Sequence, residues 1–528
     1  MVGKPELPDV CLIFEVHQPF RLNRNLHASL LSRPQVKKSD LFDLYFDNDL
    51  NREVFERAAR KCYSPANNII LEQIDRFKYD TKRFKVAYSI TGVFIEQCQR
   101  WNPNLIESFR QLAQTGCVEF FDETYYHSLS SLFDADRSEF IEQVKMHRQL
   151  MKDLFNYEPK ILVNTECIYN NAIAKLAEAL GYEAMITEGV EKVLNWRSPN
   201  YVYKAKDSNL RVLTRNYRFS DDIGFRFSAR WWNEFPLTAE KYSRWLAASH
   251  GQVISLFMDY ETFGEHQWPE TGIHEFLKWL PGEVIKWQHL NWANPTEVVR
   301  RHQPVGEIDV HEYYSISWAD LERDITAWLA NPMQWICYDQ LKQLEPLIKQ
   351  IGDADLTRLW RYFQMSDHLY YLSIKGGGPG DVHSYFNPLG SPIEAFTVFS
   401  SVLSDFEARV VRELEKPEWV ARRMLRPVPA EKCFTFFYEF ARPTKLTIQS
   451  LEEFLLALKK VNVKSIEFHK ERGDFERWVK QVIGDSVLAD KLSALTNEKL
   501  RGEKLRTQTL TVVENRINEL KTMAKLPK

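Results

Sequence analysis

The chain has 528 residues, of which 44% are hydrophobic and 27% charged, and its formal net charge is -3 at pH 7. A chain of this length can bury a large core and exceeds the usual size of one domain, while a charge so near zero gives no reason to expect nucleic acid or a membrane surface as a partner. The seven cysteines form no C-x-x-C pair, no long apolar run predicts a membrane span and no signal-peptide core precedes the first strand, so we expect a cytoplasmic protein without a disulfide framework.

Short β-rich runs alternate with amphipathic segments through the first half of the chain. The candidate strands are 10–16, 84–90, 117–122, 161–165, 184–187, 211–214 and 253–258. Amphipathic stretches such as 137–154 and 171–180 lie between them, the second closed by Gly181 as a helix stop. This alternation favours a parallel sheet and predicts a (β/α)7-type incomplete TIM-like barrel over residues 1–290. In such barrels the chemistry gathers at the carboxyl ends of the strands.

The pattern changes after about residue 290. Predicted helices 318–329, 334–351, 356–365 and 392–414 form a helical domain, 291–428, that we expect to complete the active site. The glycine-rich segment 376–380 is interpreted as a connector or lid. Beyond it, strand 433–440 and helices 451–460, 475–482 and 497–525 predict a small C-terminal α+β accessory domain, 429–528, of unknown role. An apolar stripe on the last helix predicts packing onto its own domain, with a homodimer seam as the alternative.

Polar residues stand at or near the ends of four predicted strands. The first strand leads into His17, the third contains Glu119, and the fourth and seventh are followed by Glu166 and Asp259. Converging carboxylates repel one another and lose hydration on burial, so a protein keeps such a cluster where binding or catalysis gains from it. A carboxylate pair on different strands suits glycoside hydrolysis, which needs one ionised nucleophile and one protonated acid.

Five blocks of the sequence, in order over about residues 8–400, resemble those of the family 57 glycoside hydrolases. The blocks are His17-Gln18-Pro19, Gly116 to Glu119, Asn164-Thr165-Glu166, Asp259 to Gly264 and Ser366-Asp367-His368. The resemblance implies a retaining enzyme that acts on α-1,4-glucans such as starch, glycogen or maltodextrin through a covalent glycosyl-enzyme intermediate. It implies Glu166 as the nucleophile and Asp259 as the acid/base. His17, Glu119 and Asp367 would bind the sugar.

Further candidates follow from chemistry near these blocks. Tyr370 and Trp268 are predicted to stack against sugar rings, because each has a flat apolar face with a polar edge. Glu15, Glu261 and His266 are predicted to bind substrate, with hydrogen-bonded support of the catalytic pair as the alternative.

Two positions depart from the pattern of many family members. Glu15 stands where many have a second histidine, and Val163 stands where some transferases have tryptophan. Glu15, taken with the run from Asp259 to His266, resembles the α-amylase branch more than the glucanotransferases. Hydrolysis and transfer proceed through the same intermediate, so a 4-α-glucanotransferase with the same catalytic pair is an alternative that the sequence leaves open.

Two other classes compete with a glycosidase. A metal-dependent carbohydrate deacetylase would place two histidines at i, i+4 spacing, and none of the thirteen histidines is so spaced. We therefore expect no metal and no other cofactor. A glucan-binding regulatory protein is the non-enzymatic alternative, but it would have little use for both Glu166 and Asp259. The expected partner is an α-glucan oligosaccharide or polysaccharide.

Overall fold

The computed structural model describes residues 8–32, 35–133, 136–376, 387–498 and 500–526. By their internal contacts they fall into two units, one comprising residues 1–348 and 353–404 and the other residues 349–352 and 405–528. Beyond Gly376, the glycine-rich segment interpreted as a connector or lid lies outside the described residues.

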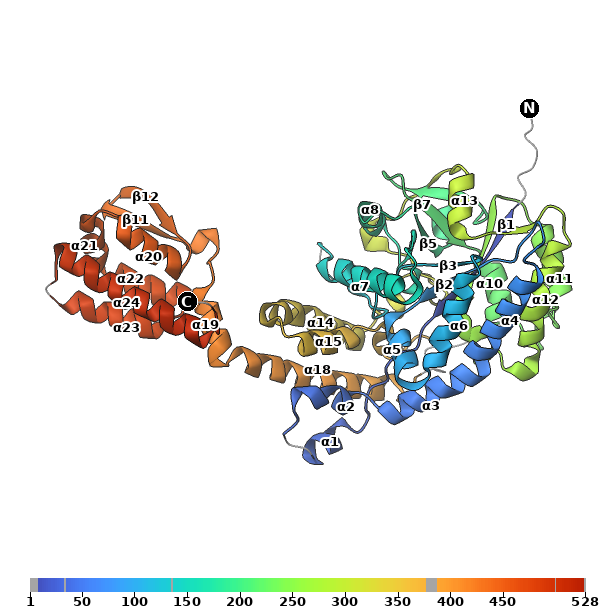
Figure 1. Ribbon diagram of the computed structural model, residues 1–528, viewed down its shortest axis with the longest axis horizontal. Helices are drawn as coiled ribbons and strands as arrows, with labels where there is room; N and C mark the ends of the chain where they lie inside the picture. Colours follow the sequence, from blue (N-terminus) through green and yellow to red (C-terminus); the bar gives the residue numbers. More distant parts are fainter. Residues whose placement is uncertain (1–7, 33–34, 134–135, 377–386, 499, 527–528) are drawn as a thin grey trace. The chain divides into compact units, whose positions relative to one another are not determined.

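Seven parallel strands of the larger unit pair in order around a barrel, and Figure 1 labels several of them. The seven strands are β1 (Asp9–Val16), β2 (Val86–Ile90), β3 (Val118–Phe120), β4 (Ile161–Val163), β5 (Ala184–Glu188), β7 (Arg211–Arg215) and β8 (Val253–Asp259). Parallel pairing runs from β8 through β1 and β2 to β3, and from β4 through β5 to β7. A bridge from Asp122 to Leu162 joins β3 to β4, and the pair Arg215 and Ser255 joins β7 to β8. The predicted (β/α)7 barrel is confirmed.

Three short strands, which the sequence did not predict, add to the sheet. They are β6 (Val202–Ala205), β9 (Asn291–Trp292) and β10 (Glu307–Ile308). Strand β6 runs antiparallel to β7, and the register joins β7 to β8 at the single pair Arg215 and Ser255. At this seam the Arg215 guanidinium also donates from Nε to the carbonyl oxygen of Phe257 in β8, at 2.6 Å. A side chain thus adds a bond where the backbone ladder is short.

The alternation of side chains along each strand decides which residues face the barrel interior. In β1, Cys11 and Ile13 belong to the interior cluster, whereas Val10, Leu12 and Phe14 pack outward into the cluster shared with the helices. Glu15 and His17 continue the inward series. Helices α4 (Ser64–Arg76), α6 (Pro103–Gln114), α11 (Ala239–Ala247) and α12 (Ile273–Ile285) lie on the outside of the barrel (Figure 1).

The helices predicted over 334–351, 356–365 and 392–414 are present, the first two beginning at Pro332 and Ala354, and a short unpredicted helix begins at Ser366. In chain order these helices are α14 (Pro332–Ile351), α15 (Ala354–Tyr362), α16 (Ser366–Tyr370) and α18 (Pro392–Leu414). The predicted helix over 318–329 is wrong, because the segment consists of turns and one short 3-10 turn, Ile325–Ala327. Asp320 and Arg323 have φ angles of 55° and 52°, which an α-helix cannot accommodate.

The smaller unit combines a hairpin with a group of helices. Strands β11 (Phe434–Glu439) and β12 (Arg442–Ile448) pair antiparallel. The helices are α20 (Leu451–Lys460), α21 (Val463–Arg472), α22 (Asp474–Trp478), α23 (Ser486–Asn497) and α24 (Gly502–Met523). Val513, Ile517 and Leu520 of α24 are buried in the core of this unit, so the predicted apolar stripe packs onto its own domain.

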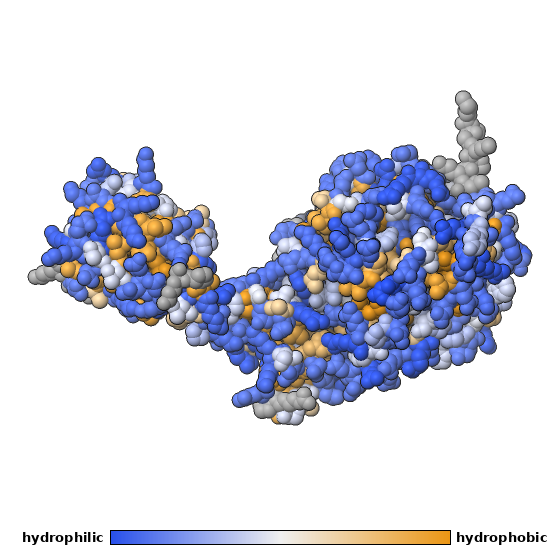
Figure 2. All heavy atoms as spheres, in the orientation of Figure 1, coloured by the Kyte–Doolittle hydropathy of each residue, from blue (hydrophilic) through white to orange (hydrophobic). Residues whose placement is uncertain are grey.

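Hydrophilic residues cover most of the visible face of each unit, with apolar side chains scattered among them (Figure 2). Among the described residues, no helix combines the length and the hydropathy that a membrane crossing requires.

Candidate active site

A cleft opens at the carboxyl ends of the barrel strands. Its lining includes Glu15, His17, His127, Glu166, Arg215, Asp221, Asp259, Glu261, His266, Trp318, Asp320, Arg323, Asp367 and Tyr370. All of the site residues predicted from the sequence are in this lining except Glu119 and Trp268. The chain after the barrel supplies the wall from Trp318 to Tyr370, as expected of a segment that completes the site.

Glu166 lies in a strained turn directly after β4. Its φ and ψ angles are 57° and 26°, and the following Cys167 also has a positive φ, 56°. Left-handed backbone at residues other than glycine costs about 1–3 kcal/mol and persists where the surroundings enforce it. Here Asn164 spans the turn, donating from Nδ2 to the carbonyl oxygen of Ile168 at 2.9 Å. The turn carries the Glu166 carboxylate into the cleft.

Both oxygens of Glu166 accept hydrogen bonds. The Ser366 hydroxyl donates to Oε1 at 3.0 Å, and the Trp318 indole donates from Nε1 to Oε2 at 2.6 Å. Hydrogen bonds donated to both oxygens favour the carboxylate form, which a nucleophile requires. Ser366 begins α16 and Trp318 follows β10, so two segments beyond the predicted barrel hold this side chain.

Asp259 presents the opposite environment. It ends β8, where the register places it beside Glu15 of β1. Burial, followed by the charge of Glu166, raises the pKa of Asp259 to about 7. Within the described residues its carboxyl group has no hydrogen-bond or ion-pair partner. At pH 7 about half of the Asp259 carboxyl groups therefore carry a proton, and no other group among the described residues accepts it.

Glu261 supports the same side of the cleft. Burial and the charge of Asp259 raise the pKa of Glu261 to about 8, and the Tyr63 hydroxyl donates to its Oε1. His266 nearby has its pKa lowered to about 4 by burial, so its imidazole is neutral at pH 7.

His17 joins the first strand to the segment after the barrel. Its Nε2 lies 2.9 Å from Oδ2 of Asp367, and its Nδ1 lies 3.0 Å from Oγ1 of Thr91. Burial by itself would raise the pKa of Asp367, but the charge and hydrogen bond of His17 hold it well below its usual range. A fixed imidazole and an ionised carboxylate on one wall can together bind the hydroxyl groups of a sugar ring.

Sequence reasoning missed His127 and Glu123, which follow β3. The His127 ring stacks on His17 with centroids 4.1 Å apart, and its Nδ1 lies 3.2 Å from Oε2 of Glu123. Burial alone would lower the pKa of His127, but Glu123, Glu166 and Glu15 raise it well above its usual value. His127 is therefore a buried cation among carboxylates. Glu123 directly follows the predicted third strand, and this position at a strand end could have marked it as a site residue.

Glu119 and Trp268, which were predicted to bind substrate, are not in the lining of this cleft. Glu119 faces inward from β3, but its oxygens accept hydrogen bonds from the backbone N–H (3.0 Å) and the hydroxyl of Thr296 in α13 (Pro295–Arg301). Trp268 is 54% exposed, and Nζ of Lys61 sits 4.8 Å from its ring centroid. Glu119 thus lies on a strand that leads to the cleft, but nearer to the amino end of the barrel than the cleft itself.

Within the described residues, one group of side chains could hold a metal ion. Ligand atoms of Glu15, Glu123 and His127 lie within 4.8 Å of one another, and all three residues are buried. Oε1 of Glu15 has no hydrogen-bond partner, while Glu123 accepts from the Ser89 hydroxyl at 2.7 Å. Burial and the charge of Glu123 raise the pKa of Glu15 well above its usual value. A protonated Glu15 beside a charged His127 lowers the repulsion between the two carboxyl groups of this cluster.

A (β/α)7 barrel with paired carboxylates at its carboxyl end defines a class of carbohydrate-processing enzymes. Residues 11–311 match the model of glycosyl hydrolase family 57. A protein of Methanocaldococcus jannaschii described as "Putative alpha-amylase" is 49% identical over 414 residues, which cover 77% of this chain and 85% of the relative. The chain belongs to glycosyl hydrolase family 57, as the sequence blocks suggested.

Two solved structures share the fold. A family 57 branching enzyme from Thermococcus kodakaraensis aligns with a TM-score of 0.52 at 14% identity, over 78% of this chain and 90% of that one. The alpha-amylase AmyC from Thermotoga maritima aligns with a TM-score of 0.50 at 13% identity, over 77% and 93%. At this level of identity the alignments establish the architecture and leave substrate and bond type to the chemistry of the site.

Proposed function

We propose that this protein cleaves α-1,4-glucans with retention of anomeric configuration, with Glu166 as nucleophile and Asp259 as acid/base. The observation that carries the proposal is the contrast between the two groups. Donors hold both oxygens of Glu166, whereas Asp259 has a pKa raised to about 7 and a carboxyl group with no partner in the described chain. Divergent environments of this kind mark a nucleophile and an acid in one site.

The reaction would proceed in two displacements. In the first, Asp259 gives its proton to the glycosidic oxygen as the bond to the anomeric carbon breaks, and a Glu166 oxygen forms an ester with that carbon. In the second, ionised Asp259 takes a proton from water as the water oxygen attacks the same carbon, and Glu166 leaves as a carboxylate. The protein returns to its starting protonation state after each cycle.

Side chains around this pair would hold the sugar. Asp367, held in place by His17, presents an acceptor on one wall, and Glu261 and His266 line the region beside Asp259. Tyr370 remains a candidate for stacking against a sugar ring. The centroid of its ring lies 6.0 Å from that of Trp328, and its hydroxyl donates to Oδ1 of Asp320 at 3.1 Å. The description of the 49% identical relative as an alpha-amylase supports an α-glucan as the substrate.

Incubation with maltoheptaose and with amylose tests the proposal. Rising reducing ends with shorter products are expected, and the first product should show the α-anomer by proton NMR. A redistributed ladder without new reducing ends would instead identify a glucanotransferase with the same catalytic pair, because only the acceptor differs.

The matched variant is Glu166→Gln, which keeps the size of the side chain and one of its two hydrogen-bond acceptors. Its turnover should fall by a factor on the order of 10³ or more, because the amide cannot form the glycosyl ester. Circular dichroism and melting temperature should stay near the wild-type values. Wild-type turnover by this variant would refute the assignment of the nucleophile.

A further inference from the structure

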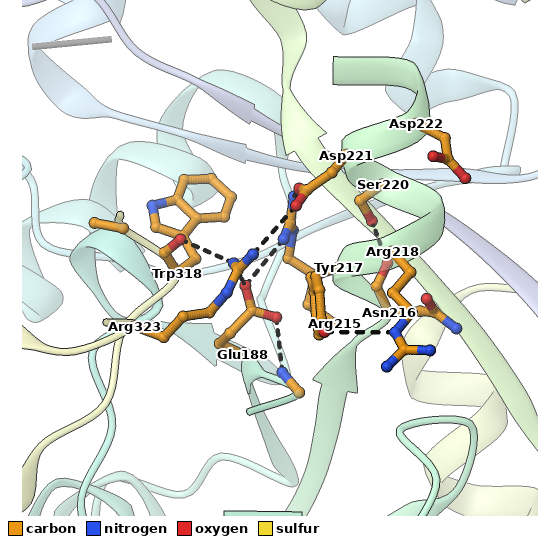
Figure 3. Close-up of polar contacts among 12 residues, drawn as sticks. Glu188, Arg215, Asn216, Tyr217, Arg218, Ser220, Asp221, Asp222, Trp318 and Arg323 are labelled. Carbon is orange, nitrogen blue, oxygen red and sulfur yellow. Dashed lines mark hydrogen bonds and ion pairs between the residues drawn. The ribbon is translucent and has the colours of Figure 1, made fainter. Parts of the chain in front are cut away.

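Four buried charged side chains form a closed ring at one wall of the cleft (Figure 3). They are Glu188 at the end of β5, Arg215 at the end of β7, Asp221 in α10 (Tyr217–Gly224), and Arg323 in the loop that follows β10. Their side chains are at most 10% exposed. Two positive and two negative charges make the ring neutral, so no buried charge is left without a partner.

Each arginine of the ring binds both carboxylates. Arg215 reaches Glu188 at 2.9 Å and Asp221 at 2.6 Å. Arg323 reaches Glu188 through Nη1 and Asp221 through Nη2, the latter at 3.1 Å. Planar guanidinium groups suit such double contacts, which a single ammonium cannot reproduce.

Arg323 is the member of the ring that does not belong to the barrel. Its guanidinium also donates to the carbonyl oxygen of Trp318 at 3.1 Å and lies 4.3 Å from the ring centroid of Tyr217. Its own carbonyl oxygen accepts from the backbone N–H of Ser317 at 3.2 Å, which closes the loop 317–323 on itself. Arg323 therefore fastens this loop to the carboxyl ends of β5 and β7.

The same loop carries the residue that holds the nucleophile. The Trp318 backbone N–H donates to the carbonyl oxygen of Glu166 at 3.2 Å, and its indole donates to the Glu166 carboxylate at 2.6 Å. The indole ring packs on Phe257, with centroids 4.9 Å apart. Contacts thus run without a gap from Arg323 through Trp318 to Glu166.

We propose that Arg323 is a positioning residue for Glu166: it fixes the loop 317–323 on the barrel so that the Trp318 indole N–H orients the attacking carboxylate. This inference rests on the proposed function, since it assigns Arg323 a part in that reaction. Arg323 acts through Trp318 and needs no contact with the substrate. Its loss should affect the rate of the chemical step more than substrate binding.

Three single variants and one double variant test this coupling. Arg323→Met should lower kcat by about 100-fold, the cost expected when a reacting group is misplaced by about 1 Å, with little change in KM. Arg323→Lys should lower kcat by about tenfold, because lysine keeps the positive charge but cannot bind both carboxylates as a guanidinium does. Trp318→Phe should lower kcat as much as Arg323→Met does. The double variant, Arg323→Met with Trp318→Phe, should lower kcat no more than the more damaging single change does. Losses that multiply would overturn the proposal.

A neutral pair of changes separates positioning from the burial of an unpaired charge. Arg323→Met leaves one positive and two negative charges in the ring, whereas Arg323→Met with Glu188→Gln restores neutrality. The variant with both changes should melt closer to the wild-type temperature than Arg323→Met alone, but its turnover should stay as low. Recovery of turnover along with stability would show that unpaired charge, rather than a lost contact with Trp318, caused the defect.

Hydrogen exchange keeps the test separate from activity. The Trp318 amide donates to Glu166, so its exchange reports the docking of the loop directly. In Arg323→Met, exchange across 317–323 should rise by about tenfold or more. Unchanged exchange would overturn the positioning role. Wild-type protein that cleaves no α-glucan would refute the proposed function instead, while the exchange result would still decide how Arg323 holds the loop.

Discussion

The two ends of the barrel treat inward-facing carboxyl groups in different ways. Near the amino end, Glu119 is buried with a pKa raised to about 7, and at the carboxyl end Asp259 has a pKa raised to about 7 as well. Burial is the main cause in both cases. The oxygens of Glu119, however, accept two hydrogen bonds from Thr296 at the start of α13, whereas Asp259 faces the cleft without a protein partner in the described chain.

This difference shows that a raised pKa does not by itself identify a catalytic acid. Glu119 helps to close the barrel. It accepts hydrogen bonds from the first turn of α13, and this helix packs Val298 and Val299 into the interior cluster. Asp259 has the same affinity for a proton but keeps that proton available to a ligand. Access and unfilled hydrogen-bonding capacity separate the two roles.

The largest expected effect comes from making the same change at both ends. Asp259→Asn should reduce kcat on α-glucans by about 10²–10⁴-fold, the usual contribution of a general acid. Glu119→Gln removes a carboxyl group of similar pKa but should leave kcat unchanged within about threefold, because it lies outside the cleft. Steady-state kinetics on maltoheptaose measures both. Equal losses in the two variants would abolish the distinction between the two ends.

The pH dependence of the wild-type enzyme should sharpen the comparison. Asp259 must be protonated to donate, and its pKa is raised to about 7, so kcat/KM should fall as the pH rises through about 7. Above that midpoint the decline should approach about tenfold per pH unit. Glu119→Gln should leave the midpoint in place even though it removes a second group of that pKa. A midpoint that shifts in Glu119→Gln would mean that the barrel ends are electrostatically coupled.

The smallest expected effect concerns stability alone. Thr296→Val keeps the shape of the side chain but removes the hydroxyl that donates to Glu119, which should lower the free energy of unfolding by about 1–3 kcal/mol. Thr296→Ser should retain most of the stability. Urea denaturation measures the change, and kcat should match the wild type in both variants. A loss of activity from Thr296→Val at unchanged stability would contradict the purely structural role assigned to this end.

The sequence predicted the barrel because its strands are short apolar runs separated by amphipathic segments. It also predicted Glu166 and Asp259 from the motif blocks, and the structure places both in one cleft. Their roles stay predictions. Glu119 was predicted from a motif block, and a motif does not report the level of a residue along the barrel, which depends on register with the neighbouring strands. The register pairs Glu119 with Ala87, below the cleft.

Residues on the chain after the barrel were harder to predict. Trp318 and Arg323 lie in a segment whose local pattern predicted a helix, because its apolar residues recur at helical spacing. Tertiary contacts override that preference: the ion pairs of Arg323 and the hydrogen bonds of Trp318 hold two residues of the loop at positive φ. Such contacts join residues more than a hundred positions apart, and no local pattern reports them.

The single register pair between β7 and β8 has a consequence for how this enzyme can diverge. Arg215 joins the two strands at the seam through its backbone position and its bond to Phe257, and its guanidinium also forms part of the cleft wall. The Arg215 side chain therefore both helps to close the barrel and lines the cleft. Mutations that retune this wall for another sugar would also loosen the closure, so adaptation should proceed more readily through the opposite wall.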